Sequence, residues 1–314
     1  MGMEVLSSRA IIGIYYELLE QAMGTWVDGL SFYSPSDQSS EDYKWLGMSP
    51  QMREWIGGRL AKGLRDDGIT IKNKPFESTL EINIDDLRRD KTGQLQIRIG
   101  EQVDRAKSHW MKLLSTLLLN APSTVCYDGQ FYFDTDHAEG DSGTQDNDIT
   151  VDISTLAVSQ HGSITVPSIE EMNRCIMKAI QQIYSFKDDQ GEPINELARN
   201  FLVMLPVPLW HIAVAAIRNP ILSSGESNTI PNFNEIKITP VPNPRLTWTD
   251  SFSVHRTDGR TKPFIRQEEV PVEVSAVAEG SELEFYHRKH HYGLYASGNV
   301  GYGMWQHSVY LTML

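Results

Sequence analysis

Apolar residues recur every three or four positions along residues 97–119. This spacing places them on one face of an amphipathic helix. At a rise of 1.5 Å per residue, the helix would be on the order of 35 Å long. Pro122 is expected to end it, because proline cannot continue the hydrogen-bond ladder of a helix. A shorter pattern of the same kind covers residues 9–23 and predicts a helix within an N-terminal arm.

Two more helices are predicted in the middle of the chain. Ser168 followed by Glu171 is the signature of a capping box, in which each side chain satisfies a backbone N–H at the start of a helix. The apolar stripe that follows consists of Ile169, Met172, Ile176, Ile180 and Ile183. Residues 201–205 predict a buried strand, and residues 209–217 predict a helix with proline near its first turn.

Extended structure is predicted on both sides of a turn at residues 66–68. Residues 52–85 are expected to form two ribbons joined by this turn, with Pro75 at a sheet edge or a bulge. Such a ribbon has little core of its own and needs a partner surface to be ordered. The arm and the ribbon are therefore expected to leave apolar surfaces that need a partner surface to cover them. The polar stretch 31–42 suggests an extended connector between them.

The C-terminal third is expected to be mostly sheet, because β-branched and aromatic residues are frequent there. Strands are predicted at residues 235–241, 247–256, 270–277, 283–286, 292–296 and 309–313. Earlier in the chain, Asp128-Gly129 lies between two aromatic runs and predicts a hairpin over residues 124–133. A polar loop is expected to follow at 134–148.

The composition is that of a folded protein with an acidic balance. The chain has 314 residues, enough for two lobes or one large domain. Its formal charge of −13 disfavours direct nucleic-acid binding, because a polyanion would be repelled. The two cysteines, Cys126 and Cys175, are too far apart in sequence for a zinc knuckle or a disulfide framework. No apolar run reaches the length of a membrane span, and neither secretion nor a membrane location is expected.

Two clusters of polar residues could carry chemistry. Asp134, Asp136 and His137 could coordinate a divalent cation, although such a run after a strand more often caps turns. His287, His290 and His291 could bind zinc or respond to pH, although no cysteine or second motif accompanies them. A solvated or subunit-facing basic edge is the favoured interpretation of the histidines.

Three further patterns favour structure over function. Residues 298–303 contain three glycines but do not open a helix, so we expect a tight turn and not a phosphate loop. No nucleophile elbow occurs, so nucleophilic catalysis has no support. The aromatic residues that could form a stacking platform for single-stranded nucleic acid are more often core residues; they are Trp55, Trp110, Tyr127, Phe131 and Tyr132.

Several segments, in this order and spacing, carry a family resemblance. They are residues 43–47, 53–57, 70–74, 76–82, 85–86, 126–133 and 135–137, with a looser match through 201–206 and the C-terminal sheet. In these segments the chain resembles the major head subunit family of Mu-like phages, known as gpT. The resemblance covers residues 40–140 best.

The resemblance implies an α+β fold, the major capsid fold named after phage Hong Kong 97. In that fold, residues 1–50 would be an N-terminal arm and 51–90 an extended loop. Residues 91–164 would form a peripheral domain around a spine helix at 97–119. Residues 165–261 would form an axial domain, and 262–314 would return to the peripheral domain.

The resemblance also implies a structural function and no enzyme activity. The subunit would assemble as hexamers and pentamers into an icosahedral head in the host cytoplasm, and would then reside in the virion. It would enclose double-stranded DNA without binding it specifically. Scaffold, portal and decoration proteins are the implied partners, with no cofactor or metal. Candidate contacts between subunits are Trp55, Arg59, Ile69, Ile71, Lys72, Phe76, Arg88 and Arg89.

Two other classes of function stay open at this point. One is a metal-dependent hydrolase that uses Asp134, Asp136 and His137. The other is a structural protein that decorates a capsid or belongs to a tail. Metal analysis would test the first alternative, and sedimentation would test the second, because only a shell subunit gives particles of hundreds of copies.

Overall fold

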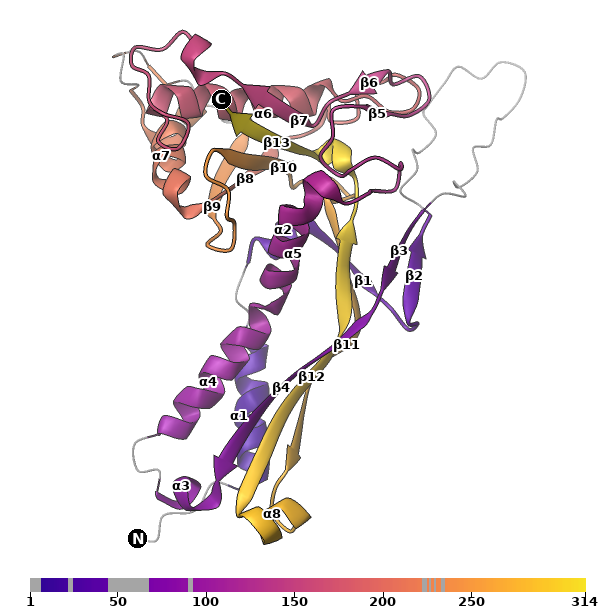
Figure 1. The fold of residues 1–314 in the computed structure, drawn as a ribbon, viewed down its shortest axis with the longest axis vertical. Coiled ribbons are helices and arrows are strands. Elements are labelled where there is room, and N and C mark those ends of the chain that lie inside the picture. The colour runs from indigo at the N-terminus through magenta and orange to yellow at the C-terminus, as the bar shows by residue number, and fades with distance from the viewer. Residues whose placement is uncertain are drawn as a thin grey trace, which may run out of the picture.

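The structure is a computed structural model that describes residues 7–21, 25–44, 68–89, 93–221, 225, 227–228, 230–232 and 235–314. Two lobes of different build lie along its longest axis (Figure 1). A broad upper lobe carries the C-terminus, and a slender lower lobe carries a long ribbon with helices beside it. We refer to these as the upper lobe and the lower lobe.

The upper lobe is built on a mixed five-stranded sheet. Its strands run in the order β7 (Asp148–Val151), β13 (Ser308–Met313), β10 (Ser251–Arg256), β8 (Asn200–Leu205) and β9 (Lys237–Pro242). β10 is antiparallel to both of its neighbours, and the two edge strands are parallel to theirs. Every residue of β10 is buried, as are five of the six in β8. Both faces of the central strands are therefore covered.

Two helices of the upper lobe begin where the sequence predicts. α6 (Ile169–Ser185) starts with the complete Ser168–Glu171 capping box, and its predicted stripe is buried from Met172 to Ile183. α7 (Val207–Arg218) follows β8 after Pro206, with proline in its first turn. Both starts depend on local chemistry, because a cap or a proline satisfies or removes N–H groups that a helix leaves unpaired.

The hairpin predicted at residues 124–133 is a tight turn with one isolated bridge, Val125 to Phe131. The N–H of Cys126 donates to the carbonyl of Gln130 at 2.7 Å. Gly129 has a φ of 91°, which favours glycine. The polar loop that follows contains a short pair of strands, β5 (His137–Ala138) and β6 (Thr144–Gln145).

The lower lobe is built on a four-stranded sheet with helices along it (Figure 1). The strand order is β1 (Ser31–Pro35), β11 (Phe264–Val277), β12 (Lys289–Tyr302) and β4 (Lys74–Asn83). β4 is an edge strand and contains Pro75, as expected for proline in a sheet. The helices of this lobe are α1 (Ser8–Glu20), α3 (Ile84–Arg89), α4 (Gln94–Lys107), α5 (His109–Asn120) and α8 (Glu282–His287).

Short elements complete the described chain. β2 (Ser40–Tyr43) and β3 (Ile69–Lys72) pair as a small antiparallel sheet beside the junction of the lobes. α2 (Val27–Leu30) precedes β1. The 3₁₀ helices are η1 (Ala121–Ser123), η2 (Ile153–Thr155), η3 (Ile230–Asn232) and η4 (Trp305–His307). The predicted connector at 31–42 is therefore extended, but most of it lies in strands.

The lobes have separate hydrophobic cores of unequal size. The main core fills the upper lobe and reaches the junction through α5, β3 and the ends of β11 and β12. A second core lies between α1, α4 and the lower sheet; its members are Ile11, Tyr15, Ile82, Leu87, Leu95, Ile99, Val103, Tyr292 and Leu294.

The expectation that the N-terminal arm needs a neighbour to cover its apolar face is wrong for α1. Ile11 and Tyr15 have no exposed side-chain surface within the chain itself. The hydroxyl of Tyr15 donates to Gln102 Oε1 at 2.6 Å, and its ring stacks on Tyr292 at 6.4 Å. The arm helix docks on its own chain because its apolar side joins the core that α4 and the lower sheet form.

The predicted single spine helix is interrupted at Ser108, which ends α4 and begins α5. The hydroxyl of Ser108 donates to the carbonyl of Arg105 at 3.0 Å. A serine that bonds back to the preceding turn competes with the backbone ladder and bends helices. Pro122 lies just past the end of α5, as predicted.

The predicted ribbons pair with distant strands. β3 pairs with β2, and β4 pairs with β12, which lies more than 200 residues further along the chain. The other predicted ribbon, residues 52–65, lies outside the described residues. Sequence periodicity shows which residues alternate, but it does not show which strand they meet.

Two predictions in the C-terminal third are wrong. Residues 283–286 are helical, because Ser281 caps α8 by accepting the N–H of Glu284 at 3.2 Å. The glycines at 298 and 301 lie within β12 and not in a turn. A Cβ at Gly298 would meet the carbonyl of Gln267, and one at Gly301 would meet Ile71. These glycines allow close approach of neighbouring chain segments.

Candidate assembly surfaces

The predicted contact residues lie in three different environments. Trp55 and Arg59 lie outside the described residues, as do the side chains of Arg88 and Arg89. Ile71 is only 3% exposed and belongs to the main core, so a neighbouring subunit cannot reach it. Its assignment as a contact is wrong, because close packing against Gly301 buries it within its own chain.

The remaining three candidates are partly or fully accessible. Ile69 is half-buried against the main core, and Lys72 is exposed. Phe76 is half-buried on β4, with its ring edge-on to His109 at 4.2 Å. Lys72 and Phe76 therefore stay predictions as inter-subunit contacts, and Ile69 has only part of its side chain available.

Phe76 lines a cavity of about 140 Å³ between the spine and the lower sheet. His109 and Trp110 close it from the helix side, next to the interruption at Ser108. Nε2 of His109 is buried, with no hydrogen-bond partner in the part of the chain that the structure describes. Burial, with a contribution from Lys112, lowers the pKa of His109, so its ring is neutral at pH 7.

The tip of the lower lobe carries an exposed aromatic pair. Phe285 is 80% exposed and Tyr286 is 67% exposed, and their rings meet edge to face at 5.1 Å. An ion pair between Arg288 and Asp85 at 2.8 Å ties α8 to α3. This pair was missed because residues 283–286 were expected to be a strand; the Ser281-x-x-Glu284 capping signature could have revealed the helix.

The histidines of the same tip do not share a strand face. His287 is exposed at the end of α8, whereas His290 is buried in β12 with Nε2 3.6 Å from Glu284. His291 contacts Glu81 at 3.1 Å. Each histidine thus meets a different acidic neighbour or solvent.

The outer side of α7 is a second apolar surface. Val207 is 50% exposed and Trp210 is 39% exposed. Val214 is half-buried on the same side, and Ile221 just past the helix is 62% exposed. The opposite side of α7 is packed into the main core through Leu209, Ala213, Ala216 and Ile217.

The end of the upper lobe that carries β5 and β6 is acidic. Between Lys112 and Asp152 the chain has seven aspartates and glutamates and no lysine or arginine. One exposed lysine, Lys187, lies beside β6. Burial, together with the carboxylates of Asp146 and Asp134, raises the pKa of Asp148 to about 6. Val125 and Phe131, on the hairpin at this end, are 52% and 42% exposed.

The residues proposed as a metal site do not converge. Asp134 accepts the backbone N–H groups of Phe131 and Thr135, and Asp136 is exposed. His137 is fully buried, stacked on Trp305 at 3.9 Å, with Nδ1 2.6 Å from Asp128. No group of three potential ligands that could hold a metal occurs among the described residues.

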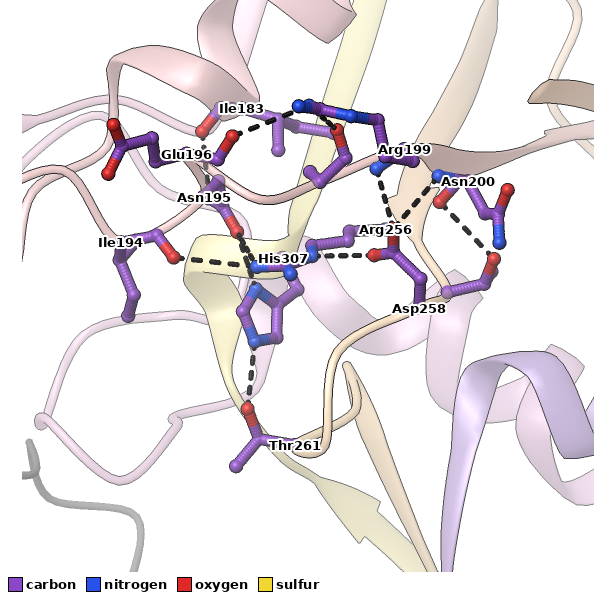
Figure 2. A network of polar contacts seen from close by, with 12 residues as sticks. Ile183, Ile194, Asn195, Glu196, Arg199, Asn200, Arg256, Asp258, Thr261 and His307 are labelled. Carbon is purple, nitrogen blue, oxygen red and sulfur yellow. Dashed lines mark hydrogen bonds and ion pairs between the residues drawn. The ribbon is translucent and has the colours of Figure 1, made fainter. Parts of the chain in front are cut away.

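A buried polar network fixes the junction of the lobes (Figure 2). Asn195 Nδ2 donates to the carbonyls of Ile183 and Gln306 at 2.8 and 2.7 Å. Its Oδ1 must then accept, and it receives Nη1 of Arg256 at 3.1 Å and Nδ1 of His307 at 2.9 Å. With Nδ1 donating, Nε2 of a neutral His307 accepts from the hydroxyl of Thr261 at 2.9 Å.

Asp258 connects this network to β8. Its carboxylate accepts Nε of Arg256 at 2.8 Å and the backbone N–H groups of Arg199 and Asn200. Burial alone would raise the pKa of Asp258, but these hydrogen bonds outweigh it and lower the pKa. Burial lowers the pKa of His307 to about 3, so the ring is neutral. These hydrogen bonds hold the segments next to β11 and β12, the two long strands that run into the lower lobe, in a fixed position.

A membrane-spanning segment does not occur in the described part of the chain, since none of its helices is both long and apolar enough. The described residues form exposed apolar patches at α7, at the 124–133 hairpin and at α8, and a groove beside Phe76. Surfaces of this kind mark sites of protein association.

The fold matches those of solved phage capsids. The structure from the JBD30 procapsid has a TM-score of 0.55 and 22% identity, and the match covers 97% of this chain and 74% of that one. The capsid of cyanophage P-SCSP1u gives a TM-score of 0.57 at 10% identity, over 94% and 91% of the two chains. At these identities the likeness shows the fold alone, which is the α+β major capsid fold expected from the sequence.

Sequence relatives are more specific. The major head subunit of the Mu-like prophage FluMu from Haemophilus influenzae is 36% identical over 105 residues, which is 33% of this chain and 34% of that protein. The major capsid protein of Escherichia phage Mu is 35% identical over 102 residues, or 32% and 33% of the two chains. The chain thus matches about a third of the length of these curated relatives.

The family comparison extends further along the chain. The model of the Mu-like prophage major head subunit gpT matches residues 9–158 and 248–312, which is more than half of the chain. The match includes the spine, the acidic hairpin end and the two long strands of the lower sheet. The chain belongs to the Mu-like prophage major head subunit gpT family.

Proposed function

We propose that this chain is the major capsid subunit of a tailed phage head. Many copies, arranged as hexamers and pentamers, would close an icosahedral shell around double-stranded DNA. The observation that carries the proposal is the family match over residues 9–158 and 248–312, together with the capsid fold. The subunit would reside in the virion, and its function would lie in its interfaces and not in a catalytic site.

The two lobes suit a shell subunit. The lower lobe would supply the peripheral domain and the upper lobe the axial domain. β7 and β13 belong to the upper sheet, so the axial domain would include residues 148–151 and 308–313 in addition to the expected 165–261. The open face of the lower sheet and the exposed patches would be covered by sister copies, at roughly 25 cal/mol per Å² of apolar area.

The test is to express the chain and look for particles. Sedimentation and electron microscopy are expected to show closed shells of uniform size, or capsomer rings if a scaffold is needed for closure. A protein that stays monomeric at high concentration, with and without a co-expressed scaffold from the same phage, would contradict the proposal.

Three finer elements belong to the same proposal. Scaffold, portal and decoration proteins would be partners of the shell. DNA would be confined without being gripped, because the charge of −13 repels a polyanion. Submicromolar affinity of the purified subunit for duplex DNA at low salt would contradict this last element.

A further inference from the structure

We propose that the outer side of α7 in one subunit docks on the 124–133 hairpin end of the next subunit around a capsomer. The inference rests on the proposed function and names one of its interfaces. Its partner is a second copy of this chain. Two different patches, at opposite ends of the same lobe, would meet in a contact that repeats around a ring.

The first patch is the exposed side of α7, which is mostly apolar but also carries the exposed His211. Apart from His211 and Arg218, the helix carries no polar side chain, since the remaining residues are valine, proline, leucine, tryptophan, isoleucine and alanine. One side is buried in the main core, but Val207 and Trp210 on the other side remain exposed. Exposed apolar side chains gathered on one side of a helix mark a site of protein association. In the proposed contact, the next subunit covers this exposed side of α7.

The second patch is apolar and already rigid. Val125 and Phe131 are exposed on the hairpin, whose backbone bonds hold it in one conformation. Tyr132, which follows Phe131 and is fully buried in the main core, donates to the carbonyl of Pro263 at 3.0 Å. A preorganised patch loses little entropy when it binds.

The two patches are complementary in charge. No aspartate or glutamate occurs between Glu196 and Glu226, a segment that contains α7 with its exposed Arg218. The hairpin end is mostly acidic: Asp136 and Asp141 are exposed there, and the exposed Lys187 lies beside β6. Opposite potentials across an interface favour the correct partner and register.

The positions of the patches fit a ring. α7 lies at one end of the upper lobe, and β5 and β6 lie at the other (Figure 1). The 2.6 Å contact between Asp128 and His137 joins the hairpin to β5, so the second patch is at the β5 end. A heterologous contact needs two different patches that face different neighbours, and it closes a ring when the rotation allows.

The first test is a pair of matched variants. Trp210→Glu places a charge in the α7 patch at a position that is 39% exposed, so the helix should be kept and the circular dichroism should stay close to that of the wild type. Its particle yield is expected to fall at least tenfold. Leu314→Glu is the control, because Leu314 is 61% exposed in the same lobe but outside both patches. It should form particles at the yield of the wild type.

The second test is disulfide cross-linking in assembled particles. Cys126 and Cys175 are buried, so introduced thiols are the ones that react. Val207→Cys combined with Gln130→Cys is expected to give a ladder of covalent multimers after oxidation, and neither single variant should. Val207→Cys with Phe285→Cys, at the tip of the lower lobe, should give no ladder.

The outcomes separate the inference from the proposed function. Absence of particles from the wild-type chain under all assembly conditions contradicts the function. If wild-type, Leu314→Glu and Trp210→Glu chains all form particles equally well, the α7 contact is wrong and the function stands. A ladder from the Phe285 pair, or none from the Gln130 pair within intact particles, would also overturn the contact.

Discussion

The upper and lower lobes bury apolar surface in different ways. Among the described residues, the main core joins 42 buried apolar residues, and the core of the lower lobe has nine. β10 is buried along its whole length, whereas β4 is mostly exposed and β12 alternates between buried and half-buried positions over its first residues. The upper sheet is covered on both faces, and the lower sheet on one.

This difference indicates where stability and assembly reside. The upper lobe has a core large enough to hold its shape alone, and the polar network of Asn195 and His307 fixes the strands that leave it. The lower lobe is a ribbon stiffened by α1 and α4, with an open face and an exposed aromatic tip. We expect core changes in the upper lobe to unfold the molecule, and changes in the lower lobe to act locally.

The largest effect is expected from Trp305→Ala in the upper lobe. Trp305 is fully buried, between the ring of His137 and that of Phe186. Removing it should lower the free energy of unfolding by ~3–5 kcal/mol, through lost contacts and a cavity. Denaturant titration of the soluble subunit measures this loss. Trp305→Phe should cost clearly less. A loss below about 1 kcal/mol for the alanine variant would contradict the view that the core of the upper lobe carries the stability of the molecule.

Acidification should weaken the upper lobe next most strongly. Burial lowers the pKa values of His255 and His307 to about 3, below the usual value of 6.5. The unfolded chain therefore takes up protons first, and stability is lost as the pH falls from 6.5 towards 3. Each histidine should cost about 1.6 kcal/mol between pH 6.5 and pH 5, because the unfolded-state imidazole is half protonated at pH 6.5 and the slope then approaches 1.36 kcal/mol per pH unit.

The measurement is the unfolding midpoint as a function of pH. His307→Asn keeps a donor for Asn195 and should remove one histidine's share of the acid dependence. If His307→Asn has the same pH profile as the wild type between pH 6.5 and 5, His307 does not control it.

Asp148→Asn, at the acidic end of the upper lobe, should raise the free energy of unfolding at neutral pH. The pKa of Asp148 is raised to about 6 by burial and by the nearby carboxylates of Asp146 and Asp134. A raised carboxyl pKa costs stability as the pH rises through it, so the neutral amide should stabilise the fold at pH 7 and not at pH 3. Because Asp148 is partly exposed, screening limits the gain to ~1 kcal/mol. Thermal unfolding at the two pH values tests the sign, and a loss at pH 7 would contradict it.

The smallest effect is expected in the lower lobe, from Tyr15→Phe. The change removes the hydrogen bond to Gln102 and keeps the ring against Tyr292, so it should cost about 1 kcal/mol. Hydrogen exchange should show faster opening of α1 and α4, with unchanged protection of β8 and β10. Equal loss of protection in both lobes would mean that they unfold as one unit.

Local signals in the sequence determined several elements of this protein. The capping box at Ser168, the apolar run of β8 and the Asp128-Gly129 turn each act within a few residues, and all three are present in the structure. The order of motifs along the chain also indicated the family and its fold. These features are readable because their energies come from neighbours in the sequence.

Only the tertiary structure decided which distant surfaces meet. β4 pairs with β12, α1 docks on α4 through Tyr15, and Gly301 in β12 makes room for Ile71. Asp136 and His137 are neighbours in the sequence, yet Asp136 is exposed and His137 is buried, because only His137 stacks on Trp305. Periodicity gives a residue's face within its own element, but the partner of that face is set by packing between segments far apart in the chain.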